Sequence, residues 1–452
     1  MSLNLKLGGA LTALVLTLVA CTGPAATTAP TTAPTASAPG SEAPMSEAPM
    51  SEAPMSEAPM TEAPSITPEP TAPPAVTACE GGGEGGTLAG ELTVWHSYGS
   101  GAGTEADALA QGLALVCAEN PGLKVDVVGL DFGSLFQVYR LQAINGDPDL
   151  FIAPNDSMWE LAEATLLQNV ADSIDQAQFS QLAIDGSSYT TTSGDAGIWQ
   201  VPESLKAVAL YYNADAIETP PATTDDLLAA VEGGASLGLL QGSYHNYGWW
   251  GAFGGQLMDD SGRCTASETG VSDAFAFMAE LRDAGATFYP AYDDMAADFK
   301  AGDLDMIVDG PWAAGGYVVD VENLGVAPMP DGPDGPALPM TGVDGWNINP
   351  YGDNVDLAVD FAIRMVQPDI QAIYADVAYH IPSNPSVPAS ENEVSAQFAD
   401  AVQNGALRPQ RQELGGFWGN FDNALNRVID EDIDPVVAVD EACQAMNDAN
   451  GL

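Results

Sequence analysis

Apolar and polar residues follow two alternating patterns in the part of the chain after residue 90. Short runs rich in β-branched and apolar residues predict strands at 91–95, 124–128 and 149–153. Apolar residues at helical spacing predict helices over 104–118 and 157–167. This order is typical of an open, mostly parallel sheet flanked by helices, in which ligand-facing loops follow the strands.

A second set of elements with the same alternation follows. Strands are predicted at 236–240 and 305–308, and helices over 272–284 and 355–366. The chain has 452 residues, and a single core rarely grows beyond roughly 250–300 residues. The sequence therefore predicts two α/β lobes rather than one sheet.

The first residues have the pattern of an export signal. Lys6 precedes the apolar run 7–20, which is shorter than the roughly 20 residues that span a bilayer as a helix. The sequence Leu-Val-Ala-Cys at 18–21 resembles the lipobox of bacterial lipoproteins, which implies cleavage before Cys21 and a lipid on its thiol. Ordinary secretion, with a cysteine there by chance, remains the alternative.

A low-complexity segment follows the signal. Residues 22–78 contain no aromatic residue, Leu, Lys or Arg, and the pentapeptide Ser-Glu-Ala-Pro-Met at 41–45 recurs in tandem. Such a composition cannot bury a core, and its prolines favour extended structure. We expect residues 1–20 to be the signal and residues 21–87 to be a lipid-anchored, disordered stalk.

The charge balance excludes several function classes. The chain has 11 Lys and Arg against 63 Asp and Glu, a net charge of -52, so nucleic acid and anionic lipid surfaces would repel it. No lysine is followed by Ser or Thr, as a phosphate-binding loop requires. The three histidines are isolated along the sequence and there is no C-x-x-C motif. We expect neither a metal nor a cofactor.

One longer motif resembles a known family signature. Residues 299–312, Phe-Lys-Ala-Gly-Asp-Leu-Asp-Met-Ile-Val-Asp-Gly-Pro-Trp, resemble the F-x-x-G-x-x-A-M-x-x-x-G-x-W signature of carbohydrate-type extracellular solute-binding proteins. These are the maltodextrin-binding relatives of ABC importers. Asp305 departs from the signature's small residue. Segments 91–98, 206–213, 342–346 and 416–418 agree in order and spacing, so the resemblance covers about residues 90–450.

The resemblance implies a two-lobed fold of the periplasmic-binding-protein type, with each lobe a mostly parallel sheet flanked by helices and a hinge between the lobes. The first lobe would comprise residues 88–204 and 318–368, and the second 205–317 and 369–452. Segment 197–213 resembles the first hinge crossing. The implied function is to trap a sugar or oligosaccharide in the cleft between the lobes and deliver it to an ABC permease. The resemblance further implies a monomeric binding protein rather than an enzyme. It would be held at the membrane only through its lipid.

A sugar ring has an apolar C–H face and a polar rim, so its site needs flat aromatic rings together with carboxylates or amides. The resemblance places stacking aromatics at three tryptophans and one tyrosine, and polar contacts at the loops after the first and third strands and near the hinge. The candidate ligand-binding residues are Trp312, Trp418, Trp346, Tyr244, Asp156, Asn155, Ser97 and Lys206.

Some candidates have a structural alternative. Trp312 could cover the second core, and Trp418 could pack its helix. Lys206 either pairs with an acid of the protein or faces the ligand, and in the second case an acidic or polar sugar is favoured over plain glucan.

With Cys21 lipidated, four cysteines remain in an exported chain, and an even number predicts disulfides. The lobe boundaries implied by the resemblance place Cys79 and Cys117 in the first lobe, and Cys264 and Cys443 in the second. A bridge between lobes would obstruct closure, so we expect Cys79–Cys117 and Cys264–Cys443.

Two rival functions remain. A secreted glycoside hydrolase would also carry aromatic rings and paired carboxylates, and a sugar-sensing or adhesion receptor could use the same scaffold. The signature at 299–312 and the stalk favour capture and delivery.

Overall fold

A computed structural model of the chain describes residues 75–99, 104–389 and 393–452. The expected signal, Cys21 and the stalk up to residue 74 lie outside the described residues. Within the described ranges, no helix combines the length and the apolar character needed to cross a membrane.

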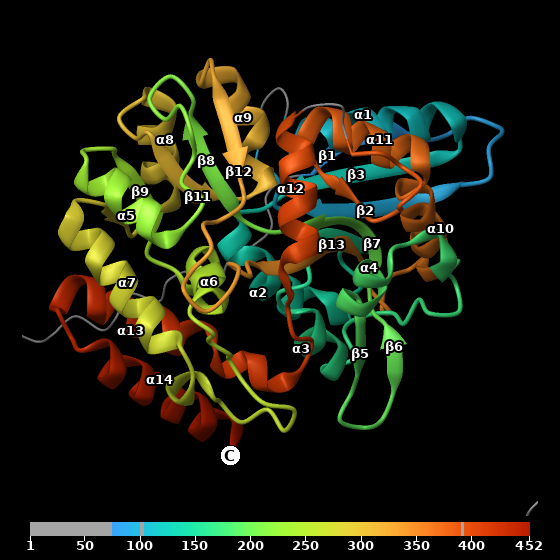
Figure 1. Cartoon of the computed structure of the whole chain (residues 1–452). Helices are drawn as coiled ribbons and strands as arrows, with labels where there is room; N and C mark the ends of the chain where they lie inside the picture. The colour runs from blue at the N-terminus through green and yellow to red at the C-terminus, as the bar shows by residue number, and fades with distance from the viewer. Residues whose placement is uncertain (1–74, 100–103, 390–392) are drawn as a thin grey trace, which may run out of the picture. The chain divides into compact units, whose positions relative to one another are not determined.

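The first lobe is built on a mixed sheet with the order β1-β3-β2-β4-β13-β7-β14, and β15 pairs with β13 (Figure 1). Its strands are β1 (Val76–Glu80), β2 (Gly90–His96), β3 (Leu123–Gly129), β4 (Leu150–Pro154), β7 (Val201–Lys206), β13 (Met340–Ile348), β14 (Ile381–Pro382) and β15 (Ala406–Leu407). A separate hairpin joins β5 (Ser188–Thr190) to β6 (Ala196–Ile198).

Successive side chains along these strands point to opposite faces of the sheet, which divides the interior of the first lobe into two cores. Val94 and Ile152 belong to the core under α1 (Glu105–Glu119), α10 (Val355–Met365) and α11 (Pro368–Ala378). Their neighbours Trp95 and Phe151 belong to the opposite core, with α2 (Phe132–Gln142) and α3 (Met158–Glu163). Figure 1 shows α1 and α11 above the strands and α3 below them. The first sheet is therefore buried on both faces, as the apolar run at 149–153 predicts.

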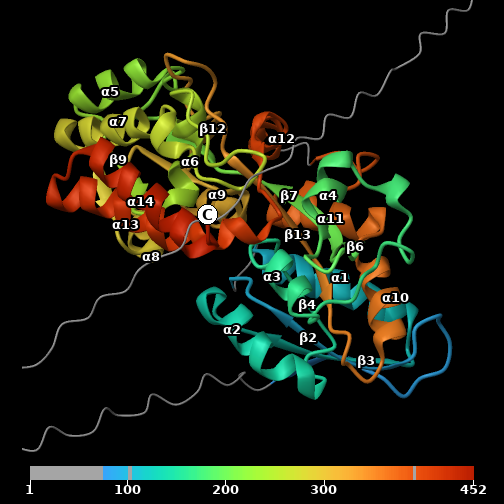
Figure 2. The same cartoon turned by 90° about the horizontal axis from the view of Figure 1, so that it is seen from below.

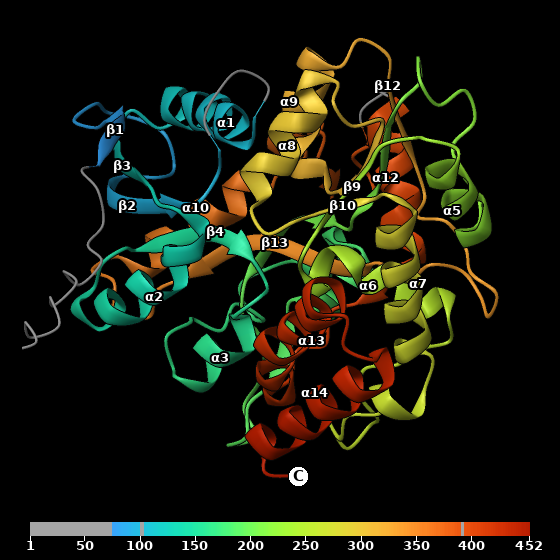
Figure 3. The same cartoon turned by 90° about the vertical axis from the view of Figure 1, so that its left-hand side faces the viewer.

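The second lobe contains a sheet with the order β10-β9-β11-β8-β12. Its strands are β8 (Ala209–Asn213), β9 (Leu237–Leu240), β10 (Thr287–Tyr289), β11 (Met306–Asp309) and β12 (Leu324–Ala327). The helices around it are α5 (Thr224–Glu232), α6 (Ser243–Ala252), α7 (Val271–Ala284), α8 (Tyr292–Ala301), α9 (Ala314–Asp320), α13 (Trp418–Glu431) and α14 (Pro435–Asn450). Figure 3 shows α13 and α14 side by side, and their apolar residues pack in one core with those of α7.

The two-lobed α/β fold is as expected, but the sheets are mixed rather than mostly parallel. Strands β3, β2 and β4 are mutually parallel, whereas β13 runs antiparallel to both β4 and β7. In the second sheet, β8 is antiparallel to β11 and β12. The antiparallel pairs arise because β7, β8, β12 and β13 carry the chain back and forth between the sheets instead of returning through a helix.

Sheet membership moves three of the expected lobe boundaries. The chain passes from β7 to β8 through residues 207–208, close to the expected first crossing. Strand β12 pairs with β8, so the second lobe continues through residue 327 rather than ending at 317. Strand β14 pairs with β7 and α11 packs against α1, so residues 368–382 belong to the first lobe. Helix α12 (Glu393–Asn404) contacts strands of both sheets (Figure 2).

The third moved boundary is the start of the first lobe. The stalk was expected to reach residue 87, but residues 76–80 form β1, which pairs antiparallel with β3. Cys79 in this strand is 2% exposed and bonded to Cys117 of α1. The low-complexity composition before residue 79 hid this strand, because β1 buries only its cysteine.

The two disulfides lie within single lobes. Cys79–Cys117 links β1 to α1, and Cys264–Cys443 links the chain before a short 3-10 turn (Ala266–Glu268) to α14. Both pairs are those expected from the sequence. Neither restrains the movement of one lobe against the other.

We expect peptide mapping of the non-reduced secreted protein to recover Cys79 linked to Cys117 and Cys264 linked to Cys443. Mass spectrometry before and after reduction measures this directly. Recovery of Cys117 linked to Cys264 would contradict both the pairing and the division into lobes.

Candidate functional site

Three of the predicted aromatic residues come together at the edge of the second lobe. Tyr244 lies in the first turn of α6, Trp312 lies in a 3-10 turn directly after β11, and Trp418 begins α13. All three are half-buried, and the ring centroids of Tyr244 and Trp312 are 6.1 Å apart. The aromatic residues expected from the signature and from the C-terminal segment therefore share one face.

A buried arginine connects these rings to the first lobe. Arg408 follows β15, is 2% exposed, and its guanidinium carbon lies 5.1 Å from the ring centroid of Tyr244 and 5.6 Å from that of Trp418. Its Nη1 donates to Asn155 Oδ1 at 3.0 Å and forms an ion pair with Asp156. Arg408 thus stacks on the second lobe while holding an acid that follows β4 of the first lobe.

Sequence reasoning missed Arg408. Its one available signal was the rarity of cations, since the chain has 11 Lys and Arg in total. The rarity of cations singled out Lys206, and it applies equally to Arg408, which precedes Trp418 in the chain.

Lys206 forms the second cation–acid pair of this region. Its Nζ lies 2.7 Å from Asp344 Oδ1, and the two side chains are 14% and 3% exposed. Burial lowers the pKa of Lys206, but the opposing charge of Asp344, with Tyr244 and Asp156 as further contributors, raises it overall. The same ammonium lies 5.5 Å from the ring centroid of Trp312. Lys206 therefore pairs with an acid of the protein, which was the first of its two predicted alternatives.

Trp346 was predicted to bind ligand, but the structure places it in the first core. It is 0% exposed and packs edge-on against Phe361 of α10, with ring centroids 5.7 Å apart. Trp346 pairs directly with Ile152 of β4, and both residues belong to the core under α1, α10 and α11. Directly opposite residues of an antiparallel pair project to the same face of a sheet, so the register of β13 against β4 turns the indole into this core.

Asn155 is a positioning residue rather than an exposed contact. It is 0% exposed, its Nδ2 donates to the Gly186 carbonyl at 2.8 Å, and its Oδ1 accepts from the Val343 amide at 3.2 Å. Its amide is therefore engaged within the protein. Ser97 is half-buried in the loop directly after β2, and the loop's next residues, 100–103, lie outside the description.

A chain of hydrogen bonds fixes the Trp312 ring. The indole Nε1 donates to the Tyr292 hydroxyl at 3.1 Å, which lies 3.0 Å from Asp309 Oδ2. Asp309 is fully buried at the end of β11 and also accepts from Tyr317 at 2.7 Å. His245 packs edge-on to the indole, with ring centroids 6.0 Å apart. Because its polar edge is anchored in this way, the indole presents a rigid face at the site.

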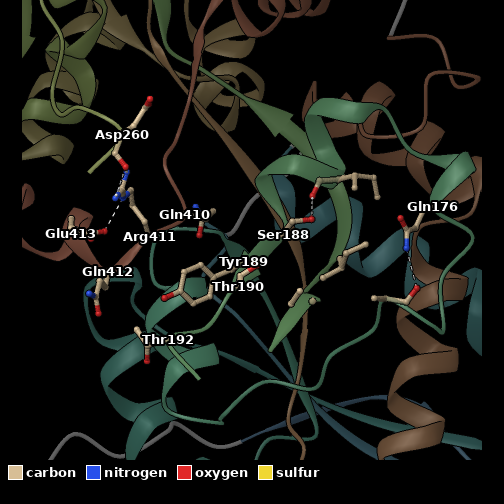
Figure 4. Close-up of a pocket in the computed structure, with 15 residues that line it drawn as sticks. Gln176, Ser188, Tyr189, Thr190, Thr192, Asp260, Gln410, Arg411, Gln412 and Glu413 are labelled. Carbon is tan, nitrogen blue, oxygen red and sulfur yellow. Dashed lines mark hydrogen bonds and ion pairs between the residues drawn. The ribbon is translucent and has the colours of Figure 1, made fainter. Parts of the chain in front are cut away.

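A cavity of about 860 Å³ lies next to the aromatic cluster, between the β5–β6 hairpin and residues 410–413. Figure 4 shows Tyr189 and Thr192 on one side of it and Arg411 on the other. The Gln410 side chain donates to the Asn155 carbonyl at 3.1 Å, which joins the cavity wall to the Arg408 cluster. None of the predicted binding residues lines this cavity. We place the site at the cluster because its rings, acids and cations converge there.

Comparison with known proteins adds the family. The sequence pattern of the family described as bacterial extracellular solute-binding protein matches residues 116–406. The chain belongs to this family. Membership makes it a binding protein and sets the glycoside hydrolase alternative aside.

Individual relatives agree with the family and the fold. The maltodextrin-binding protein MdxE of Bacillus subtilis (strain 168) is 25% identical over 314 residues, which are 62% of this chain and 72% of that protein. A maltooligosaccharide ABC transporter solute-binding lipoprotein of Streptococcus pneumoniae serotype 4 is 23% identical over 327 residues, 67% of this chain and 74% of that one. The structure of the Thermus thermophilus maltotriose-binding protein bound with maltotriose has a TM-score of 0.72 at 27% identity, and it covers 80% of this chain and 100% of that one.

His96, at the end of β2, is held neutral. Burial lowers its pKa from the ordinary 6.5 to about 4. Its Nδ1 accepts a hydrogen bond from the Tyr98 amide at 3.1 Å, which requires an unprotonated nitrogen. The loop that starts at Ser97 is thus tied to a neutral imidazole.

This neutral state makes stability depend on pH. The unfolded chain takes up a proton on His96 near pH 6.5, whereas the folded chain does so only near pH 4. Stability is therefore lost as pH falls through this window, at roughly 1 kcal/mol per pH unit. Urea unfolding of the wild type and of His96→Gln at pH 7.5 and pH 5 measures the difference. An equal loss of stability in both proteins between these pH values would contradict the assignment.

Proposed function

We propose that this protein is a lipid-anchored, extracytoplasmic solute-binding protein that captures a sugar or oligosaccharide between its lobes and delivers it to an ABC permease. The observation that carries the proposal is the cluster in which Trp312, Trp418 and Tyr244 of the second lobe meet Asp156 and Asp344 of the first. Flat rings beside carboxyl groups suit a molecule with an apolar face and a hydroxyl rim.

Unused hydrogen-bonding groups in the cluster support a polar ligand. In the described part of the chain, Arg408 Nε and the Tyr244 hydroxyl are buried atoms without a hydrogen-bond partner. Buried polar atoms are nearly always paired in folded proteins. A sugar hydroxyl can accept from the arginine and pair with the tyrosine at the same time.

The cations of the cluster favour a neutral ligand over an acidic one. Arg408 and Lys206 each pair with a carboxylate of the protein, Asp156 and Asp344 respectively. These pairs hold the two carboxyl groups in place, so that their remaining lone pairs can accept from ligand hydroxyls. An acidic sugar would have to compete with both internal acids. Together with relatives named for maltodextrin and maltotriose, this makes a neutral glucose oligosaccharide the first ligand to test.

Ligand capture is expected to follow the hinge mechanism. The chain crosses between the sheets at residues 207–208, between β12 and β13, and after β15. Arg408 lies on the third crossing and touches residues of both lobes. A ligand that contacts both faces favours the closed arrangement by its differential affinity.

Anchoring and delivery rest on the lipobox-like sequence at 18–21 and on the stalk. A relative from Streptococcus pneumoniae that is named a lipoprotein of an ABC transporter supports both. We further propose that the protein acts as a monomer, with the membrane reached only through Cys21.

Removing a stacking ring should weaken ligand binding without unfolding the protein. For Trp312→Ala or Trp418→Ala we expect a loss of about 1–3 kcal/mol in the affinity for maltotriose, measured by isothermal titration calorimetry. Tyr351→Ala is the matched control, because Tyr351 is 46% exposed and lies outside the cluster. Wild-type affinity in both tryptophan variants would remove these rings from the site, and a wild-type protein that binds no sugar in a broad screen would refute the proposed function.

Replacing the lipidated residue should release the protein from the membrane. Because the composition of residues 22–74 cannot bury a core, Cys21→Ser should keep the melting temperature of the wild type. A detergent-free wash followed by quantification of the membrane and soluble fractions checks the outcome. Retention of Cys21→Ser in the membrane fraction would contradict the anchor.

A further inference from the structure

A second group of buried charged side chains shares Asp344 with the sugar site, and its other members play no part in the function proposed above. Glu105 begins α1, Glu203 lies in β7, Asp344 lies in β13, and His380 lies between α11 and β14. Their side chains are 12%, 1%, 3% and 4% exposed, respectively. Four separate segments of the chain therefore bring ionisable groups to one buried point.

The imidazole of His380 is held between two carboxylates. Its Nδ1 lies 2.8 Å from Glu203 Oε2, and its Nε2 lies 3.0 Å from Glu105 Oε1. Donor atoms of Glu105, Asp344 and His380 all lie within 4.8 Å of one another. Two carboxylates and one imidazole thus point at a common position.

This position requires a positive charge. When Nδ1–H donates to Glu203, the lone pair of Nε2 faces an oxygen of Glu105, and two lone pairs at this distance repel each other. Either a proton or a metal ion must lie between them. Glu203 binds Nδ1, the imidazole nitrogen on the side away from Glu105. In metal sites, a carboxylate in this place commonly orients the histidine that binds the metal.

A buried hydroxyl without a partner points to the same position. Tyr374 is 0% exposed, and its hydroxyl has no hydrogen-bond partner among the residues that the structure describes. Its ring packs on the imidazole of His380, with ring centroids 5.3 Å apart. A buried donor without a partner therefore adjoins the cluster.

We propose that Glu105, Asp344 and His380 form a binding site for a divalent transition-metal ion of the zinc type, with Glu203 orienting the imidazole. Mixed nitrogen and oxygen donors suit zinc and its neighbours better than calcium or magnesium, which take oxygen ligands. Binding displaces the proton between Nε2 and Glu105, and this proton leaves to solvent. The metal would join the start of α1 to the crossing strand β13 at the base of the sugar site.

Lys206 provides a sharp test, because it is the lysine that pairs with Asp344. Its ammonium competes with a metal ion for that carboxylate. Lys206→Met should therefore bind the metal more tightly than the wild type. A purely structural role for the cluster predicts no gain of metal affinity in this variant.

The experiment uses the mature protein after treatment with a chelator and removal of the chelator. We expect titration calorimetry with zinc chloride to show one high-affinity site, and cobalt(II) to give a visible absorption band that zinc abolishes. Glu105→Gln, His380→Gln and Glu203→Gln should each lose about tenfold or more in zinc affinity. His245→Gln is the matched control, since His245 also lies beside a buried acid, Asp309, but outside the cluster.

The zinc titration does not involve sugar. A failure of the metal-site proposal can therefore be distinguished from a failure of the proposed function. Zinc affinity that is unchanged in both Glu105→Gln and His380→Gln would place the metal on the acidic surface and overturn the proposal. Absence of zinc and cobalt binding in the wild type would overturn it as well. If His380→Gln does not fold, Glu105→Gln carries the test, because Glu105 lies at a helix start.

Discussion

The buried guanidinium of Arg408 is the interaction on which the arrangement of the site depends. A charge taken out of water is tolerated only when it is paired and hydrogen-bonded. Arg408 pairs with Asp156 and bonds to Asn155 of the first lobe, and its guanidinium lies near the rings of Tyr244 and Trp418 of the second. One side chain therefore connects the polar half of the site to its aromatic half.

The placement of cations in this acidic protein follows from the same constraint. On the surface, the excess of acids is hydrated and needs few partners. In the interior a carboxylate needs a compensating group, and Lys206 and His380 supply it to the buried Asp344 and Glu203. The buried Arg408 pairs with the partly exposed Asp156. Most other cations of the described chain form partly exposed pairs, such as Arg364 with Glu119.

The sequence predicted the fold and part of the site, and the failures have physical causes. Periodicity located the parallel strands β2, β3 and β4, and the family resemblance brought Trp312, Trp418, Tyr244 and Asp156 to one place. It failed for Trp346, because the pairing of β13 with β4 places this residue opposite Ile152 in the core, and the register of strands far apart in the chain cannot be read from the sequence.

Long-range pairing was equally hidden from the sequence. Arg408 and Asp156 are 252 residues apart, and the ligands of the proposed metal site are drawn from three distant segments. Histidines that look isolated along the chain can therefore share a site. The lobe boundaries failed for a related reason, because only packing against α1 and pairing with β7 assign α11 and β14 to the first lobe.

The bond between Cys79 and Cys117 acquires a mechanical meaning from its position. Strand β1 lies inside the segment predicted as the stalk, and it is an edge strand of the first sheet. Tension applied at the N-terminus would otherwise peel β1 from β3 one hydrogen bond at a time. Because Cys79 is bonded to α1, the load passes into a helix packed on the core. The candidate site, built on β4, β7 and β13, would thereby be isolated from forces on the proposed anchor.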